Sequence, residues 1–215
     1  MEKAVIFDLD GTLLDTLTDI YDSVTATLDK FNAPRRTVAE IRQFIGNGAK
    51  NLIKTSFGGN LTEEQLKERL DFYNQLYTGS GSPKTCLFDG VKETLIELKS
   101  RGYKLGILTN KPQLTTDDVY KTYLSEFDFS MVVGQRAGAK VKPDPTELLK
   151  MLDTLSVSGK DAYFVGDGET DVEVAKNANV KGIAVLWGYR DKEQLSKVGA
   201  VNFVSSPEDL LKIIN

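Results

Sequence analysis

The amino-acid sequence predicts an α/β protein whose parallel sheet is covered by helices on both faces. Short apolar runs, typical of buried strands, recur along the chain, and stretches with helical periodicity separate most of them. This alternation indicates a parallel sheet, because parallel neighbours need a crossover connection between them. The expected strands are residues 4–7, 104–108, 130–133, 162–165, 182–186 and 200–204.

The helices expected between these strands carry an apolar stripe. One stripe runs from Val91 to Leu98 and another from Leu148 to Leu155. Ser206 followed by Pro207 is typical of a first helical turn and predicts the start of the last helix.

The region between residues 15 and 83 departs from this alternation and contains only helical patterns. The expected helices are 18–31, 38–44, 49–57 and 63–77, the last after a capping box that begins at Thr62. We therefore predict a catalytic core of residues 1–14 and 84–215 and an inserted α-helical cap of residues 15–83, with residues 78–83 as a flexible return. Such an insertion would sit above the end of the first strand as a lid, and the alternative is an ordinary helical layer.

The composition excludes several kinds of chemistry. The 215 residues include no histidine and one cysteine, so an imidazole base, a histidine-dependent triad and a multi-cysteine zinc site are all excluded. We interpret Cys86 as structural. The net charge of -4 argues against general nucleic-acid binding. No segment has the length and apolarity of a membrane span, and Met1 to Lys3 lead into the first strand without a signal-peptide pattern. We expect a cytoplasmic protein that acts on small solutes, with no nucleic-acid or membrane partner.

Two carboxylates follow the first strand directly. Asp8 and Asp10 lie where the apolar run ends, and Gly11 lets the chain turn away. Carboxylates so close together repel each other, and either a divalent cation or a shared proton would compensate them. Oxygen ligands favour a hard cation such as Mg²⁺.

Other expected strands also end in polar residues. Thr109 and Asn110 follow one strand, Lys142 comes soon after a second, and Asp167 and Asp171 follow a third. Ligands of open parallel sheets bind at the carboxyl ends of the strands, so these groups should converge.

This set of groups predicts phosphoryl transfer. Asp8 would attack phosphorus and Asp10 would protonate the leaving oxygen, then take a proton from the hydrolytic water. Lys142 would offset the charge of the phosphoryl group and the nucleophile, and Thr109 and Asn110 would bind the phosphoryl oxygens.

The predicted metal ligands are acidic side chains. Asp8 and Asp167 would join Mg²⁺ to a phosphate oxygen, and Asp171 would ligate it or orient a metal-bound water. Glu169, which lies between the last two acids, leaves open which further side chain contacts the ion.

At these residues the chain resembles the haloacid dehalogenase superfamily of phosphatases. The four motifs appear in the family's order at residues 8–12, 109–110, 142–143 and 166–171. The resemblance implies a Rossmann-like core, an inserted helical cap and a metal contact through the backbone carbonyl of Asp10. Residues 45–53, 108–112, 142–145 and 187–189 look like the phosphoglycolate phosphatase-like branch, which implies hydrolysis of a small phosphomonoester such as 2-phosphoglycolate. Related members of that branch accept nucleotides, pyrophosphate or other small phosphate esters.

Substrate selection is expected to come from the cap. We predict that Asn47 and Lys50 face the acidic site, with Lys50 and neighbouring backbone N–H groups binding the carboxylate of phosphoglycolate. Alternatively, the segment from Gly46 to Gly48 merely joins two helices.

Three functions remain open at this point. The first is a Mg²⁺-dependent phosphatase, the second a phosphomutase that passes the phosphoryl group to another hydroxyl, and the third a noncatalytic phosphate or metal sensor. A dehalogenase is disfavoured, because it would leave the metal-binding acids without a purpose. The sequence does not indicate the oligomeric state.

Overall fold

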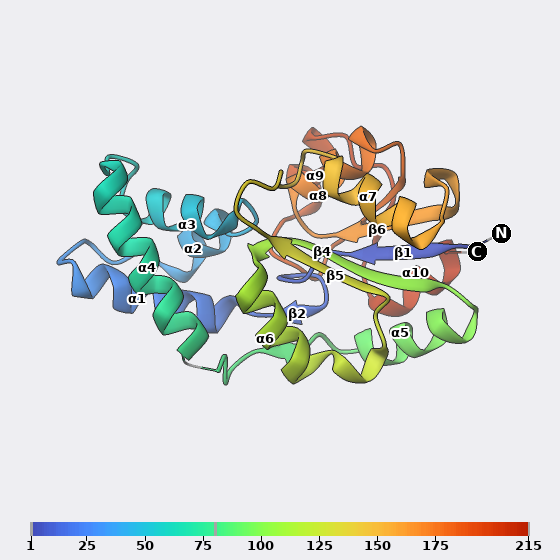
Figure 1. The fold of residues 1–215 in the computed structure, drawn as a ribbon, viewed down its shortest axis with the longest axis horizontal. Helices are drawn as coiled ribbons and strands as arrows, with labels where there is room; N and C mark the ends of the chain where they lie inside the picture. Colours follow the sequence, from blue (N-terminus) through green and yellow to red (C-terminus); the bar gives the residue numbers. More distant parts are fainter. Residues whose placement is uncertain (1, 80, 215) are drawn as a thin grey trace.

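The computed structural model describes residues 2–79 and 81–214 and shows a six-stranded parallel sheet with a helical extension at one end (Figure 1). The strand order is β5-β4-β1-β6-β7-β8, and every neighbouring pair is parallel. The strands are β1 (Ala4–Phe7), β4 (Lys104–Pro112), β5 (Met131–Gln135), β6 (Ala162–Gly166), β7 (Lys181–Val185) and β8 (Phe203–Val204). The predicted α/β class with a Rossmann-like core and an inserted helical segment is confirmed.

The central strand β1 is buried because both of its faces are apolar. Val5 and Phe7 point to one face and Ala4 and Ile6 to the other, as the alternation of side chains along a strand requires. All four residues are at most 1 % exposed.

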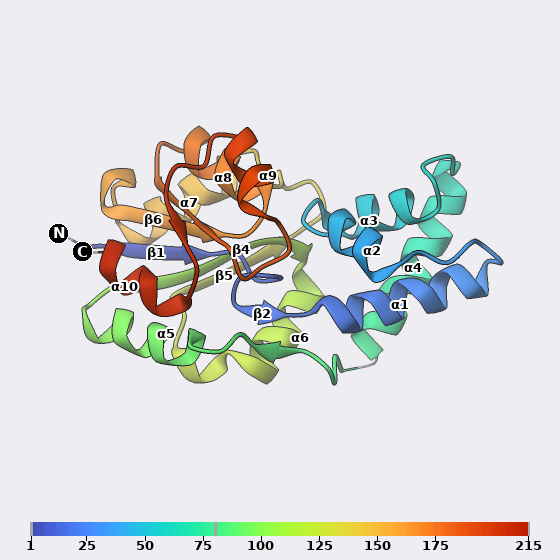
Figure 2. The same ribbon diagram turned by 180° about the vertical axis from the view of Figure 1, so that it is seen from behind.

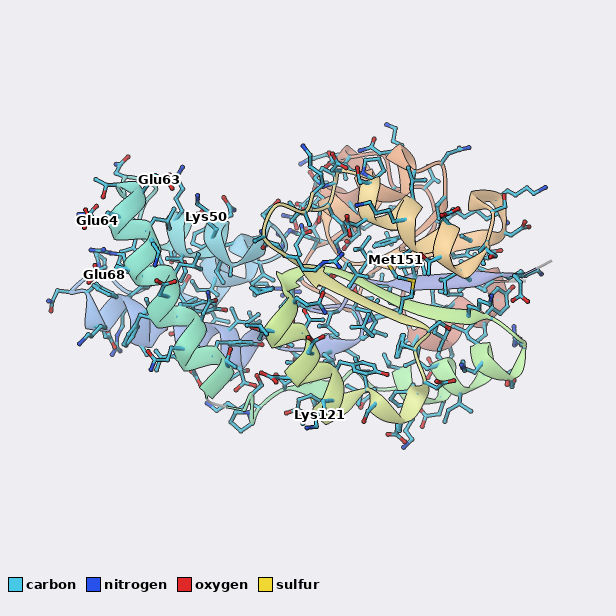
Figure 3. The ribbon with its side chains drawn as sticks, in the orientation of Figure 1. Lys50, Glu63, Glu64, Glu68, Lys121 and Met151 are labelled. Carbon is cyan, nitrogen blue, oxygen red and sulfur yellow. The ribbon has the colours of Figure 1, made fainter. Side chains whose placement is uncertain are left out.

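Helices cover the two faces of the sheet. On the Val5 face lie α5 (Val91–Ser100), α6 (Gln113–Tyr123) and α10 (Leu210–Ile213), and on the Ile6 face lie α7 (Thr146–Leu155) and α8 (Glu169–Asn177). Figure 2 shows α9 (Lys192–Lys197) on the same side as α8. Met151 of α7 points toward the sheet (Figure 3) and is 1 % exposed.

The inserted helices have an apolar core of their own. They are α1 (Leu17–Lys30), α2 (Val38–Phe44), α3 (Gly48–Ser56) and α4 (Glu63–Gly79). Ile20, Leu28, Ile41 and Leu52 belong to a buried cluster that is separate from those on the sheet. Among the residues that the structure describes, Tyr189 is the only buried member of this cluster that does not come from the helical insert.

Short strands form the entry to and exit from the helical insert. β2 (Leu14–Asp15) pairs antiparallel with β3 (Cys86–Leu87), so the two connections run side by side. The predicted boundaries at residues 14/15 and 83/84 lie near these strands and remain a prediction. In the predicted return at 78–83, Ser80 lies outside the described residues.

Several element boundaries differ from the sequence prediction. β4 extends to Pro112 instead of ending at residue 108, β8 begins only at Phe203, and the last helix starts with a short 3₁₀ turn over Pro207–Asp209. The sequence analysis missed α6, because its buried face contains Thr115 and Thr116 beside the apolar Val119. The predicted capping box is present, since Thr62 and Gln65 exchange hydrogen bonds between side chain and backbone.

No helix among the described residues is long and apolar enough to cross a membrane.

Candidate active site

The carboxyl ends of the central strands bring the predicted acids together. Asp8 follows β1, Asp167 follows β6, and Asp171 lies in the first turn of α8. These three side chains are buried, and each offers a carboxylate oxygen within 4.8 Å of the other two. The convergence expected from the parallel sheet is therefore present.

Lys142 lies between two of these acids. Its ammonium is 2.8 Å from Oδ1 of Asp8 and 2.6 Å from Oδ1 of Asp171, and its side chain is 1 % exposed. Although burial alone lowers the pKa of a lysine, Asp171 and Asp8 outweigh it and raise the pKa of Lys142. Lys142 is thus a permanent cation at the base of the site.

One lysine does not compensate three buried acids. Burial, together with the charge of Asp171, raises the pKa of Asp8 to about 6. Burial and the charges of Asp171 and Asp8 raise the pKa of Asp167 to about 8. Carboxylates held together against their own repulsion fit a divalent metal ion, which would stabilise all of them in the ionised form.

The chain holds Asp167 in a fixed position. Its Oδ1 accepts a hydrogen bond from the Thr12 hydroxyl at 3.0 Å, and its Oδ2 accepts one from the Tyr189 backbone N–H at 2.8 Å. Gly11, with a φ of +83°, packs directly on this side chain, and a Cβ at Gly11 would collide with the Asp167 carboxylate. The turn after β1 therefore requires glycine for both its conformation and the close approach.

Asp171 and Glu169 occupy different surroundings. Besides binding Lys142, Asp171 accepts a hydrogen bond from the Gly168 N–H at 2.9 Å. Glu169 instead forms an ion pair with Arg190 at 2.9 Å and is not part of the described acidic cluster. This arrangement favours Asp171 over Glu169 as the further acid near a metal.

Asp10 is not a member of the described acidic cluster and has hydrogen-bond partners of its own. Its Oδ1 accepts hydrogen bonds from the Thr16 hydroxyl at 2.8 Å and from the Lys111 ammonium at 2.9 Å. Asp8 and Asp10 both line the same cavity, so the two carboxylates with different predicted roles face a common space.

Thr109 and Asn110 also line this cavity. The Asn110 side-chain N–H groups donate to the carbonyl oxygens of Gly46 and Lys142, both at 3.0 Å, and its Oδ1 accepts the Lys142 N–H at 2.9 Å. Asn110 thus positions Lys142 and a cap loop, and the phosphoryl contact predicted for Asn110 remains a prediction.

The cavity lies between the sheet and the inserted helices and has a volume of about 40 Å³. The insert supplies much of its wall, including Ile45, Leu52, Tyr73 and Tyr77. The helices therefore cover the strand ends, as a lid would.

Two residues predicted to bind substrate lie elsewhere. Lys50 is exposed on α3 and forms an ion pair with Glu63 at 3.1 Å, and Figure 3 shows both at the edge of the helical insert away from the sheet. Asn47 is exposed, and neither it nor Lys50 lines the cavity, whereas Gly46 and Gly48 do. Their predicted binding roles are without support from this geometry.

The sequence analysis assigned no role to Lys111, although it directly follows Thr109 and Asn110, which were predicted to bind the phosphoryl group. It is the third residue of that strand end, and its backbone N–H bonds the Thr109 hydroxyl. Residues two positions apart share a face of a regular strand, and this is the signal that could have placed Lys111 beside Thr109. In the structure the register of β4 shifts between Leu108 and Pro112, and Asn110 lines the cavity as well.

Arg190 was also missed. This buried side chain pairs with Glu169 and donates to the carbonyl oxygens of Arg42, Gln43 and Ile45 at the end of α2. It thereby ties the core to the helical insert. Only the packed structure reveals this contact, since the partners are about 145 residues apart along the chain.

The fold and the site together define an α/β protein with a helical insert over a buried acidic centre suited to a divalent cation. Residues 5–185 match the haloacid dehalogenase-like hydrolase family, and the chain belongs to that family.

Similar proteins agree with this assignment along the whole chain. The chain is 31 % identical to phosphoglycolate phosphatase 1 of Pseudomonas aeruginosa over 98 % of its own length and 79 % of the relative. It is 32 % identical to phosphoglycolate phosphatase of Mannheimia succiniciproducens, covering 99 % of this chain and 98 % of the relative. A haloacid dehalogenase-like hydrolase from Streptococcus pneumoniae has a similar structure, with a TM-score of 0.88, 26 % identity, and coverage of 100 % and 99 % of the two chains.

Proposed function

We propose that this protein is a Mg²⁺-dependent phosphatase that hydrolyses a small phosphomonoester, with 2-phosphoglycolate as the first candidate, through an aspartyl-phosphate on Asp8. The main support is the position of Asp8: it lies on the cavity wall, 2.8 Å from the ammonium of Lys142 and among acids that suit a metal. A nucleophilic carboxylate needs such neighbouring cations to approach an anionic phosphoryl group.

The proposed metal ligands are Asp8 and Asp167, with the backbone carbonyl of Asp10 as the family resemblance implies. Asp171 is a further candidate, and both of its oxygens, like those of Asp167, already accept hydrogen bonds. When bound, Mg²⁺ would neutralise the crowded carboxylates and polarise a phosphoryl oxygen.

In the first step a carboxylate oxygen of Asp8 attacks phosphorus and the P–O bond to the alcohol breaks. Asp10 supplies the proton that the leaving oxygen needs. Lys142 stabilises the negative charge on the transferred group, and Thr109 donates its hydroxyl to a phosphoryl oxygen.

In the second step water attacks the phosphorus of the aspartyl-phosphate. Asp10, now ionised, takes the proton of that water, and the bond between phosphorus and Asp8 breaks. Inorganic phosphate leaves and Asp8 returns to its starting state.

The size of the cavity supports a small substrate. A volume of about 40 Å³ corresponds to roughly three water-sized spheres. With the helical insert in this position the space holds neither ligand in full, and a short organic acid phosphate needs the insert to move less than a nucleotide does. Both relatives named above are phosphoglycolate phosphatases, which supports the same substrate class.

A phosphate-release screen tests this proposal. Purified protein is assayed with 2-phosphoglycolate, sugar phosphates, nucleotides and pyrophosphate, in Mg²⁺ and in EDTA. We expect Mg²⁺-dependent release of inorganic phosphate, fastest from 2-phosphoglycolate. Substrate binding without release would support a sensor, and transfer of labelled phosphate into a second sugar phosphate would support a phosphomutase.

A further inference from the structure

Lys111 is a buried cation whose role the proposed reaction does not yet explain. It ends the polar run after Thr109 on β4, and its side chain is 5 % exposed. Of the described residues that line the cavity, Lys111 alone is a cation. Burying an ammonium costs free energy unless anions compensate it, and Asp10 at 2.9 Å compensates this one, so the open question is what its place on the cavity wall serves.

The three hydrogen bonds that Lys111 donates within the described structure differ in length. Its ammonium donates to Asp10 Oδ1 at 2.9 Å and to the Tyr77 hydroxyl at 2.9 Å. A lysine ammonium has three donor hydrogens. Asp10 Oδ2 accepts a third and longer bond at 3.2 Å, so a ligand in the cavity would take the N–H that makes this weakest contact, while Asp10 keeps the ammonium through Oδ1.

The position of Asp10 fixes which part of a substrate would meet this N–H. If Asp10 protonates the leaving oxygen, that oxygen lies beside Asp10, and the atoms attached to it lie next to Lys111. In 2-phosphoglycolate a single methylene separates the leaving oxygen from a carboxylate. The carboxylate would therefore lie within reach of the Lys111 ammonium.

Much of the wall that the helical insert supplies to the cavity is apolar, and its polar side chains, Tyr73, Asn74 and Tyr77, are not cations. Ile20, Ile45, Ala49 and Leu52 line it from the helical insert. An apolar wall with one cation selects a small substrate that has a second anionic group.

We propose that Lys111 is the specificity-determining residue that binds the carboxylate of the substrate. This inference rests on the proposed phosphatase function and assigns to Lys111 the role that the sequence had suggested for Lys50. The substrate class is an alkyl phosphate with a carboxylate one carbon from the ester oxygen.

Binding of two non-hydrolysable analogues tests the inference without turnover. 3-Phosphonopropionate has a phosphonate and a carboxylate, and propylphosphonate lacks the carboxylate. We expect the Mg²⁺-loaded wild-type protein to bind 3-phosphonopropionate at least about tenfold more tightly by calorimetry, as for one charge-assisted hydrogen bond. Equal affinities for the two analogues in the wild type would overturn the inference, whatever happens in any variant.

Variants then assign the effect to a residue. Lys111→Met should abolish the preference for the carboxylate, whereas Lys111→Arg should restore most of it. Lys121→Met is the matched control, because Lys121 is exposed on α6 at the lower edge of the view in Figure 3 and does not line the cavity, so its change should leave the preference intact. Lys50→Met tests the residue that the sequence had suggested. If Lys50→Met lost the preference for the carboxylate while Lys111→Met kept it, the inference would also be overturned.

Kinetics separates recognition from simple positioning of Asp10. Lys111→Met should lower kcat/KM for 2-phosphoglycolate about tenfold more than for ethyl phosphate. Equal losses on both esters would assign Lys111 to Asp10 alone and contradict carboxylate recognition. If the wild type released phosphate from no ester, the phosphatase proposal would fail, whereas release without a carboxylate preference would defeat only the role of Lys111.

Discussion

Replacing Asp167 by asparagine should stabilise the metal-free protein, and this gain should increase with pH. Asp167 is buried beside Asp8 and Asp171, and its pKa is about 8 in the folded protein against an ordinary value of 3.8. Asparagine has the same shape and can keep both contacts: its carbonyl oxygen accepts from the Tyr189 N–H and its amide donates to the Thr12 hydroxyl. The substitution removes the charge with little change in packing.

The sign follows from which state holds the proton. As pH rises above 3.8 the unfolded chain releases the Asp167 proton, while the folded protein keeps it until a pH of about 8. The contribution of Asp167 to stability is therefore intact below pH 3.8 and is lost progressively as pH rises to about 8. The loss amounts to about 1.4 kcal/mol per pH unit, or about 3 kcal/mol between pH 5 and pH 7. Asp167→Asn escapes this loss.

Urea unfolding in EDTA at pH 5, 6 and 7 measures the effect as a difference between variant and wild type. Asp209→Asn is the control. Asp209 forms an ion pair with Lys212, and the hydrogen bond that Lys212 donates lowers the pKa of Asp209. Removing the Asp209 carboxylate should therefore give no gain in stability that grows with pH. Added Mg²⁺ should stabilise the wild type but have little effect on Asp167→Asn. A difference between Asp167→Asn and wild type that stays constant from pH 5 to pH 7 would refute the reasoning.

Three further predictions concern catalysis and the contact between core and insert. Asp8→Asn should abolish both phosphate release and the acid-labile phosphoenzyme while the protein stays folded by circular dichroism; normal turnover would contradict its role as nucleophile. Asp10→Asn should slow alkyl phosphates much more than p-nitrophenyl phosphate, whose leaving oxygen needs little protonation; equal losses along a leaving-group series would point to a structural role. Arg190→Met should lower the free energy of unfolding by about 2–4 kcal/mol, because a buried charged donor to three carbonyl oxygens is lost. Arg35→Met is its control: this exposed side chain forms an ion pair with Asp29 at 2.7 Å, and its loss should cost much less in the same urea titration.

The acidic centre was predictable because each of its acids belongs to a short strand-and-turn motif, and because ligands of open parallel sheets generally bind at the carboxyl ends of the strands. Asp8 and Asp167 each follow a short apolar run that is typical of a buried strand, and parallel strands place their carboxyl ends at one edge. The two strands pair directly in the structure, from Ala4 opposite Ala162 to Phe7 opposite Val165.

The residues around this centre were harder to predict. Lys50 follows a glycine-rich segment and Lys111 follows a polar one, and nothing in the neighbouring sequence indicates which of the two lysines faces the site. Packing distinguishes them: α3 turns Lys50 outward to Glu63, whereas β4 continues past its predicted end and carries Lys111 inward to Asp10. The direction of a side chain depends on the orientation of its whole element, which distant contacts set.

By itself, then, the amino-acid sequence determined the α/β class, the helical insert, and the acids and lysine that meet at the strand ends. These features depend on periodicity and on short motifs, which report burial and turns within a few residues. Only the tertiary structure decided how the insert sits over the site, that Arg190 holds it there, and that Lys111 is the cation in the cavity. Those contacts join residues roughly 100 or more positions apart, so they come into existence only when the chain packs.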